Sequence, residues 1–148
     1  MGAKTISFPK GKGHLTHNNR DFISKNVVPD RTYWNRIYMQ ESLEEAYEQC
    51  FGQALLDSNA AQKRKDRRKE NYLKELENSG NKEKTFYENI VQIGKKEDTP
   101  VVDENGNLTE EAKIATEILE QYAKTFQERN PNLYLFNCVM HLDEATPH

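Results

Sequence analysis

The sequence predicts an α+β fold with a mainly antiparallel sheet flanked by helices. Three observations support this class. Short stretches of strand composition occur near both ends of the chain, two longer segments have helical periodicity, and the two kinds alternate irregularly with no internal repeat. The 148 residues suit one domain with a modest core. Three or four strands are few for a complete sheet, so we expect this sheet to be incomplete.

The first part of the chain, residues 1–40, is predicted to combine a strand with a basic loop. "KTISF" (4–8) has strand composition, and the Gly/Lys loop "PKGKGHLTHNNR" follows it. Gly11 and Gly13 would let the backbone approach a ligand closely, but the Gly-Lys-Ser/Thr ending of a Walker loop is missing. The chain is irregular up to Pro29, and the aromatic-rich "TYWNRIYM" then predicts a short strand or turn.

Residues 41–78 are predicted to be helical. "ESLEEAYEQCFGQALLD" opens with a capping box, in which Ser42 caps the helix and Glu45 lies three residues on. Its apolar residues recur at i, i+3, i+4 and i+7, so we expect Tyr47 and Phe51 to be packing residues. "KRKDRRKENYLKELEN" is also expected to be helical, though mostly polar, and "NSGN" ends it.

Residues 85–148 are predicted to form a strand, a helix and a strand. "FYENIVQIG" has strand composition and stops at a glycine, and an Asn-Gly turn at 105–106 precedes an amphipathic helix from about Thr109. "NPNLYLFNCVMHL" is apolar on both alternating faces, which is typical of a central strand covered on both sides. The expected buried face of the helix consists of Ile114, Ala115, Ile118, Leu119, Tyr122 and Phe126.

The charge of the chain is unevenly distributed. The net charge is −3, yet residues 1–36 carry seven Lys/Arg against two acids, and residues 61–70 carry six against two. Such basic blocks are typical of surfaces that contact phosphates, although the second block also suits a solvated helix face. No apolar run approaches the roughly 18 residues of a membrane helix, and no signal peptide is recognisable. Cys50 and Cys138 sit among apolar neighbours and are expected to be buried free thiols.

The last eight residues, "HLDEATPH", concentrate metal-binding side chains. His141, Glu144 and His148 offer two imidazoles and a carboxylate at the end of an apolar strand, and Pro147 fixes the backbone before the last histidine. This donor set suits a transition metal such as Mn, Zn, Ni or Co better than calcium. Asp143 is either a further ligand or a partner that orients an imidazole.

Several segments together resemble a known family. "HLDEATPH" closely resembles the third motif, H-x-D-E-x-T-P-H-x-H, of the MobV (Pre/Mob) plasmid mobilisation relaxases, and "HNNR" (17–20) resembles the first, H-N-x-R. In "VPDRTYWN", Pro29, Arg31 and Asn35 stand at the places of the family's Pro-x-Arg-x-x-x-Asn segment. "KRKD" (63–66) is similar to the basic stretch that precedes the family's next strand. The resemblance spans essentially the whole chain.

The resemblance implies a fold of the HUH-relaxase type and an activity in plasmid mobilisation and recombination. The expected activity is metal-dependent, site-specific nicking and joining of one DNA strand at a plasmid transfer origin, through a covalent protein–DNA intermediate in the bacterial cytoplasm. Because the family motif continues with a third histidine, we expect residues 1–148 to be the N-terminal portion of a longer relaxase domain. The alternative for a truncated chain of this kind is an inactive fragment, or one that pairs with a second copy through an unpaired sheet edge.

The resemblance also implies a role for each candidate site residue. His17 stands at the place of the histidine nucleophile. His141, Glu144 and His148 would hold a divalent metal, with Mn or Mg expected and Zn, Ni or Co as alternatives, and Glu144 would alternatively act as a general base. Plasmid DNA would be contacted by Lys10, Lys12, Arg20, Arg31, Asn35, Arg64 and Lys65.

The residues themselves leave alternatives open. His14 is a second candidate nucleophile three residues from His17, and Tyr33 and Tyr38 are candidate tyrosine nucleophiles that suit core or base-stacking roles better. Trp34 is either a base-stacking or a core residue. Two other functions remain open: an inert DNA-binding or self-associating fragment, and a metal-dependent phosphohydrolase unrelated to plasmids.

Overall fold

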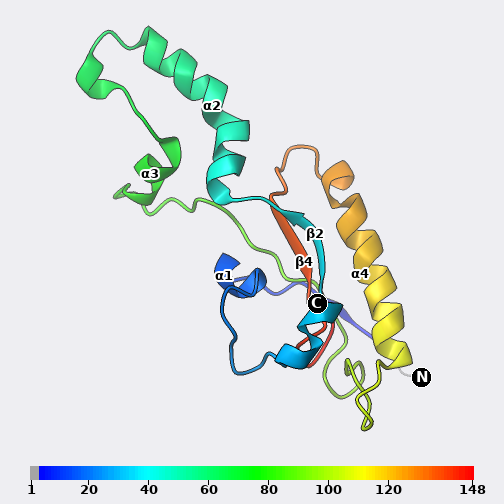
Figure 1. The fold of residues 1–148 in the computed structure, drawn as a ribbon. Coiled ribbons are helices and arrows are strands. Elements are labelled where there is room, and N and C mark those ends of the chain that lie inside the picture. The colour runs from blue at the N-terminus through cyan, green and yellow to red at the C-terminus, as the bar shows by residue number, and fades with distance from the viewer. Residues whose placement is uncertain (1–3) are drawn as a thin grey trace. The chain divides into compact units, whose positions relative to one another are not determined.

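The computed structural model describes residues 4–148 and divides the chain into two compact units. The first unit comprises the chain up to Gln40 together with Glu88–His148, and the second comprises Glu41–Tyr87. Helices and short antiparallel strands make up the fold (Figure 1), so the predicted α+β class is confirmed.

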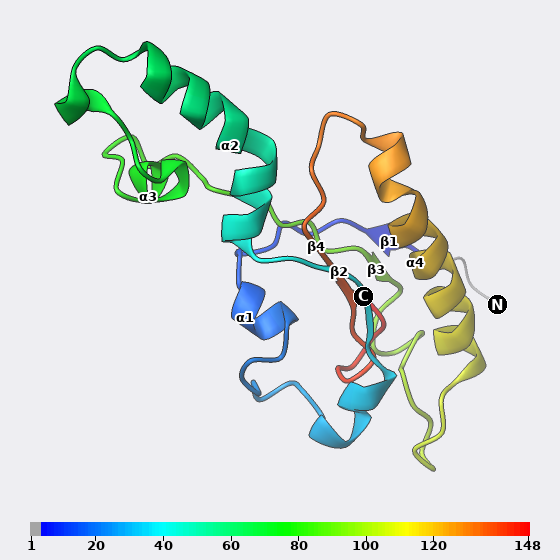
Figure 2. The same ribbon diagram turned by 45° about the horizontal axis from the view of Figure 1, so that its top comes forward.

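Among its described residues, the first unit contains two antiparallel strand pairs. Strand β1 (Ile6–Ser7) pairs with β3 (Gln92–Ile93), and β2 (Arg36–Gln40) pairs with β4 (Asn137–Met140). The second pair carries a register shift between Ile37 and Met39. Figure 2 shows β2 and β4 side by side.

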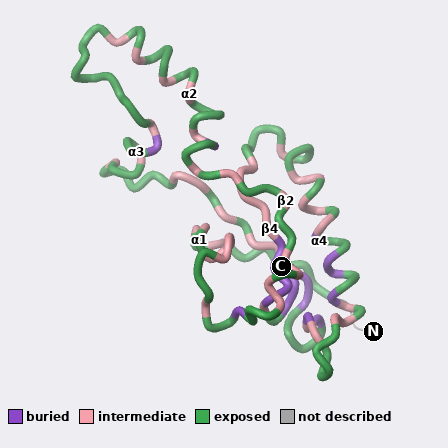
Figure 3. The backbone as a smooth tube through the Cα atoms, viewed as in Figure 1, coloured by how far each residue is buried: buried purple, intermediate pink, exposed green. Residues whose placement is uncertain are grey.

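Helix α4 (Glu110–Arg129) covers one side of both strand pairs, because it contacts β3 and β4. Thr109 caps it by accepting a hydrogen bond from the Ala112 amide at 3.0 Å. The buried residues of the first unit gather around the inner side of this helix and the chain after β4 (Figure 3). The central cluster consists of Ile93, Ala115, Leu119 and Met140, with Tyr38 and Val91 packed against it.

The predicted buried face of this helix is only partly correct. Ala115 and Leu119 are buried, but Ile114 and Ile118 are 57% and 45% exposed. Ala112 and Thr116 are buried in their place. Two-stranded pairs cover only a narrow stripe of a helix, so the apolar residues beside that stripe stay in solvent.

The strands are shorter than predicted. The stretch 130–142 was expected to form a central strand, but only Asn137–Met140 is extended, and among the described strands it pairs with β2 alone. The preceding backbone bonds to a helix side chain instead. Gln127 of α4 donates to the Leu133 carbonyl at 2.5 Å and accepts from the Leu135 amide at 3.0 Å. This competing partner keeps the apolar stretch out of the strand.

The N-terminal part contains two short helical turns. Helix α1 (Leu15–Asn18) carries the first histidine motif, and the 3₁₀-helix η1 (Pro29–Trp34) precedes β2. The sequence predicted a strand or turn from residue 32. Pro29 explains the 3₁₀ turn, because its ring fixes the φ angle required at the first helical position.

The second unit begins with helix α2 (Leu43–Ala61), and its predicted capping box is confirmed. The single helix predicted over 63–78 is wrong, because this stretch forms a 3₁₀ turn, η2 (Lys65–Arg67), and a short helix, α3 (Tyr72–Glu77). The Asn59 side chain bonds both the amide and the carbonyl of Lys69, at 2.9 and 2.6 Å, and thereby closes a loop. The clustered cations of this stretch also repel one another in a continuous helix.

Aromatic rings hold α2 and α3 together. Phe51 lies 5.3 Å from Tyr47 and 5.1 Å from Tyr72, measured between ring centroids, so the predicted packing role is confirmed, although Phe51 stays 41% exposed. Both cysteines are free thiols as expected. The expected burial of Cys50 is wrong, because the aromatic contacts of α2 leave this residue exposed, and Cys138 is half-buried.

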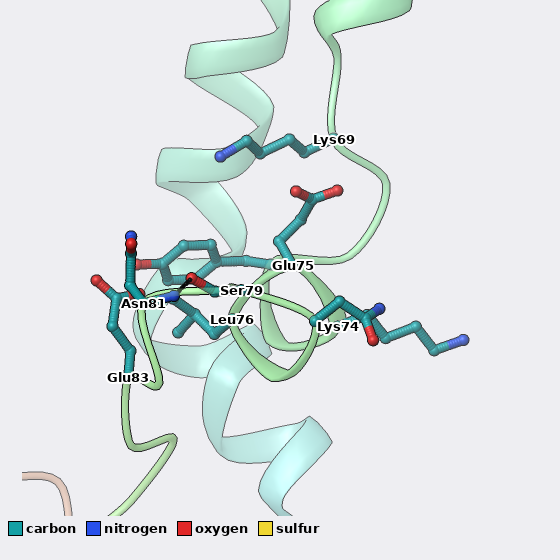
Figure 4. A pocket seen from close by; sticks show the side chains of 9 residues that line it. Lys69, Lys74, Glu75, Leu76, Ser79, Asn81 and Glu83 are labelled. Atoms are coloured by element: carbon teal, nitrogen blue, oxygen red, sulfur yellow. Dashed lines mark hydrogen bonds between the residues drawn. The ribbon is translucent and has the colours of Figure 1, made fainter.

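A cavity of about 410 Å³ is lined by residues of the second unit alone (Figure 4). Its walls alternate Lys69 and Lys74 with Glu75 and Glu83, so it presents no single charge to a ligand. None of the helices within residues 4–148 is long and apolar enough to cross a membrane.

Candidate metal centre

The chain doubles back after β4 and brings two histidines together. The His141 amide donates to the His148 carbonyl at 2.8 Å, and the His148 amide donates to the His141 carbonyl at 3.4 Å. This reciprocal pair closes the loop 142–147, most of which is buried. The two imidazole centroids consequently lie 5.1 Å apart.

Backbone carbonyls fix which nitrogen of each imidazole carries a proton. His141 Nε2 lies 2.9 Å from the Asn18 carbonyl, and His148 Nδ1 lies 3.0 Å from the Thr146 carbonyl. A carbonyl only accepts, so each of these nitrogens carries the proton. When both rings are neutral, the other two nitrogens, His141 Nδ1 and His148 Nε2, present lone pairs to each other at 3.3 Å. Two facing lone pairs repel unless a cation lies between them.

The donor set fits a divalent metal. The ligand atoms of His141, Glu144 and His148 all lie within 4.8 Å of one another. Nitrogens that bind one ion at roughly 2.0–2.1 Å stand roughly 3.0–3.4 Å apart, and the observed nitrogen separation of 3.3 Å falls in that range. Burial lowers the pKa of His141 to about 4, which keeps this ring neutral, as a metal ligand must be.

The N-terminal histidine lies directly beside this centre. His17 is in α1, and its Nε2 is 3.2 Å from Glu144 Oε1, while its ring centroid is 6.0 Å from that of His141. The His17 side chain is 23% exposed and can be reached from solvent. His14 is exposed just before α1. The structure thus brings together the two ends of the chain that carry the histidine motifs.

Arg20 links the two histidine segments. Its guanidinium forms a bidentate pair with Asp143, at 2.9 and 2.6 Å, and also donates to Glu144 Oε1 at 2.9 Å and to the His17 carbonyl at 2.7 Å. Only 9% of its side chain is exposed. Arg20 has φ of 57°, an unfavourable left-handed conformation for a residue with a Cβ, and this turn directs its side chain toward the carboxylates.

Asp143 is completely buried and engaged by three side chains. Besides Arg20, its Oδ2 accepts from the Thr32 hydroxyl at 2.9 Å and from the Asn35 amide at 2.8 Å. Burial alone would raise the pKa of this carboxyl, but these hydrogen bonds outweigh it and hold the pKa well below its usual range. Asp143 lies outside the three-ligand cluster, and its hydrogen-bond partners are the side chains of Arg20, Thr32 and Asn35 rather than an imidazole, so the structure supports neither of its two predicted roles directly.

The 3₁₀-helix η1 and the residues around it bind the same loop. The Asn35 side-chain oxygen accepts from the Leu142 backbone amide at 2.7 Å. The oxygen and the nitrogen of the Asn35 side chain are therefore both bonded inside the protein. Arg31 donates to the Glu144 carbonyl at 3.3 Å, and its buried Nε has no hydrogen-bond partner among the described residues. Asn26 donates to Glu144 Oε2 at 2.6 Å. Sequence reasoning missed Asn18, Asn26 and Thr32, because no local pattern distinguishes these polar loop residues.

The remaining predicted contact residues lie at the surface. Lys10 and Lys12 are exposed in the Gly/Lys loop of the first unit. Arg64 and Lys65 are exposed in the second unit, where Arg64 chelates Asp66 at 3.1 and 2.7 Å. Arg20 and Asn35, by contrast, use their polar groups inside the protein, so the structure gives them internal partners rather than solvent-facing ones.

The fold and the site define an α+β protein with a candidate divalent-metal centre next to an imidazole. Residues 24–148 match the family model described as plasmid recombination enzyme (Mob_Pre), and the chain belongs to this family. The family resemblance predicted from the motifs is therefore confirmed.

One solved structure is similar to this chain: the relaxase domain of MobM (MOBV; Mob_Pre), bound to manganese and to 22 nucleotides of oriT DNA of plasmid pMV158 at pH 5.5. The sequence identity is 20% and the TM-score is 0.48, and the match covers 99% of this chain and 67% of that chain. No curated protein matches the chain.

Proposed function

We propose that this protein belongs to a relaxase that nicks and rejoins one strand of plasmid DNA at a transfer origin, with His17 as nucleophile and a divalent metal as cofactor. Membership of the plasmid recombination enzyme family supports DNA as the substrate. The observation that carries the mechanism is the 3.2 Å separation between His17 Nε2 and Glu144 Oε1, because Glu144 belongs to the candidate ligand set.

The proposed chemistry is attack of a neutral imidazole on the scissile phosphate. A new nitrogen–phosphorus bond forms to the 5′ phosphate while the bond from phosphorus to the 3′ oxygen breaks, and that oxygen leaves with the electron pair and takes up a proton. Reversal of the same step rejoins the strand. A cation held by His141, Glu144 and His148 would polarise a non-bridging phosphate oxygen and stabilise the charge that develops on it.

His17 has two candidate partners for its Nε2. Arg20 Nη1 lies 3.2 Å from this nitrogen and Glu144 Oε1 lies at the same distance. A single tautomer cannot serve both, because an Nε2 lone pair accepts from Arg20 whereas an Nε2 proton is donated to Glu144. Glu144 is thus placed to take the Nε2 proton from a protonated ring. This leaves a neutral imidazole with its remaining proton on Nδ1 and its Nε2 lone pair free for attack, while Arg20 holds the segment through the His17 carbonyl.

Phosphate contacts are proposed for the cations that remain available. Lys10 and Lys12 are exposed in the first unit, Arg64 and Lys65 are exposed in the second, and Arg31 is half-buried, with one guanidinium nitrogen bonded to the Glu144 carbonyl. Arg20 and Asn35 are reassigned in this proposal: they hold the 142–144 loop in position and do not contact DNA. Pairing between two copies through a strand edge stays a prediction.

The experiment is a nicking assay on supercoiled plasmid that carries the transfer origin of the parent replicon, with Mn²⁺ added. We expect relaxed plasmid and a covalent adduct that His17→Ala abolishes and the matched control His14→Ala retains. A nitrogen–phosphorus bond is hydrolysed by mild acid and survives alkali, so an acid-stable adduct would instead indicate Tyr33 or Tyr38. Turnover of small phosphodiesters without an adduct would support the hydrolase. If neither assay gives a product, the hypothesis that remains is the inert DNA-binding fragment.

A further inference from the structure

A single carboxylate fastens the Gly/Lys loop to the helix that carries His17. Glu88 Oε2 accepts a hydrogen bond from the Gly13 amide at 2.8 Å, and its Oε1 accepts one from the Asn18 side-chain amide. The backbone is joined as well, because the Gly11 amide donates to the Glu88 carbonyl at 3.1 Å. All these residues belong to the first unit, and Glu88 is half-buried there.

The same contact leads directly to a candidate metal ligand. Asn18 ends α1, and its main-chain carbonyl accepts the hydrogen bond from His141 Nε2 at 2.9 Å. That bond decides which nitrogen of His141 keeps a lone pair for a metal. Asn18 therefore links the Glu88 carboxylate to the His141 ring. It also directly follows the nucleophile candidate His17 in the chain.

Gly11 shows how closely the carboxylate approaches the loop. A Cβ atom at this position would lie 2.0 Å from Glu88 Oε2 and 2.2 Å from its Cγ. The close approach that Gly11 permits in this structure is thus to Glu88 itself. Because the atoms in the way belong to a flexible side chain, an alanine here would displace the carboxylate from Gly13 and Asn18 and leave the backbone in place.

We propose that Glu88 is a positioning residue that sets the tautomer and orientation of His141 through Asn18 and holds α1 against the metal centre. Any effect of Glu88 on nicking rests on the proposed function, whereas its effects on the His141 tautomer and on metal binding do not. A carboxylate is required because both partners are N–H donors, and only an acceptor-only group receives both. An amide of the same shape would turn an NH₂ group toward one of the two donors.

The test compares Glu88→Gln and Gly11→Ala with the exposed control Glu117→Gln in the full chain. The first readout is the ¹⁵N spectrum of the imidazoles, which reports which ring nitrogen of His141 is protonated. The second is the affinity for Mn²⁺ measured by calorimetry. We expect the metal-free wild type to hold His141 as the Nε2–H tautomer and both site variants to show a mixture. We also expect about a tenfold loss of Mn²⁺ affinity, at the low end of what outer partners contribute.

A double variant isolates the contact. In a Glu88→Ala background the obstruction is gone, so Gly11→Ala should add less than a twofold further loss of Mn²⁺ affinity. An unchanged His141 tautomer and Mn²⁺ affinity within twofold of wild type in Glu88→Gln would overturn the proposal. Should that variant not fold, Gly11→Ala decides by the same two readouts. A changed tautomer and affinity in a protein that forms no DNA adduct would leave Glu88 in this role and refute the relaxase proposal alone.

Discussion

Asp143 joins three segments of the first unit through one buried side chain. It receives hydrogen bonds from Arg20 after α1, from Thr32 in η1 and from Asn35 before β2. Removing such a charge from water is costly, and only a full set of charge-assisted hydrogen bonds offsets that cost. The loop that carries Glu144 is therefore held by a network in which the loss of one member deprives each of the others of a hydrogen-bond partner.

The first prediction concerns this network. We expect Asp143→Asn to lower the free energy of unfolding at pH 7 by about 3 kcal/mol, because the buried Arg20 guanidinium loses its bidentate charge partner and keeps only Glu144. Urea unfolding measures the loss, and Glu104→Gln, at an exposed turn residue, is the control. A difference of less than about 1 kcal/mol, typical of a surface pair, would contradict the prediction.

The pH dependence of this loss follows from the pKa of Asp143. Its folded-state pKa lies below the ordinary value, so the unfolded chain takes up the proton first as the pH falls. The stability that the carboxylate contributes is complete above about pH 4, the ordinary value, and disappears progressively below it. We therefore expect the wild-type and Asp143→Asn unfolding free energies to converge in acid.

The metal centre gives a second prediction at the level of single side chains. Because the lone pairs of His141 Nδ1 and His148 Nε2 face each other, a bound cation should stabilise the fold. Mn²⁺ at 100 times its Kd should raise the free energy of unfolding by about 2.7 kcal/mol, and a chelator should reverse this. His148→Ala should abolish the effect and His14→Ala should keep it. Equal stabilisation of both variants in thermal melts would place the ion elsewhere.

At the scale of elements, the turn after β3 depends on a glycine. Gly94 has φ of +68°, and its amide donates to the Thr5 carbonyl at 2.8 Å beside the β1–β3 pair. A Cβ at this position would lie 2.1 Å from the hydroxyl of Thr99, which is fully buried. Gly106, in an exposed turn, has φ of +80° and open space around it.

These two glycines make a matched pair for the third prediction. Gly106→Ala should cost about 1 kcal/mol, the penalty for a left-handed residue with a Cβ. Gly94→Ala adds a steric clash with a buried residue, so its cost should exceed that of Gly106→Ala by at least about 1 kcal/mol. Denaturant unfolding of both variants measures the difference, and equal costs would show that the turn after β3 adjusts freely.

Elements set by local interactions could be predicted from the sequence. The capping box at Ser42 and the apolar periodicity of α4 involve neighbours within one or two turns, and both are confirmed in kind. The irregular stretch before β4 could not be predicted in this way, because its backbone is hydrogen-bonded to the side chain of Gln127, which belongs to α4. The break between η2 and α3 likewise depends on Asn59, which lies ten residues from its partner.

The candidate site divides in the same way. His141, Glu144 and His148 lie within eight residues, so their proximity is a local property that the sequence carries. The position of His17 beside them is a tertiary property, and it could be expected only through the family resemblance. The internal role of Arg20 was missed because an arginine in a basic segment gives no sign of two carboxylate partners elsewhere in the chain, one buried and one half-buried.

At the scale of the whole molecule, the two basic blocks fall into different units. The cations of residues 1–36 include one that is buried in the site network, Arg20, whereas those of residues 61–70 are exposed on and around η2. Arg64 is partly neutralised by Asp66, but both side chains of this pair are more than half exposed, and such a pair contributes little. The second block thus keeps most of its charge available for phosphates.

The salt dependence of DNA binding tests this distribution. Each phosphate neutralised on a single strand contributes about 0.7 to the slope of log K against log salt concentration, because condensed counterions are released. Replacing both Arg64 and Lys65 by alanine should therefore lower the slope by about 1.4 if both contact the strand. The matched control replaces Lys113 and Lys124, which are exposed on α4 and paired with Glu110 and Glu120.

The two double variants remove the same net charge, so a general effect of charge on association would change both slopes alike. A decrease confined to Arg64 and Lys65 would place the second unit on the path of the DNA, since counterion release requires local contact. An unchanged slope in both would exclude Arg64 and Lys65 as phosphate contacts, and Lys10, Lys12 and Arg31 of the first unit would remain as the proposed contacts. That result would favour a solvated surface at 61–70, the alternative that its composition leaves open.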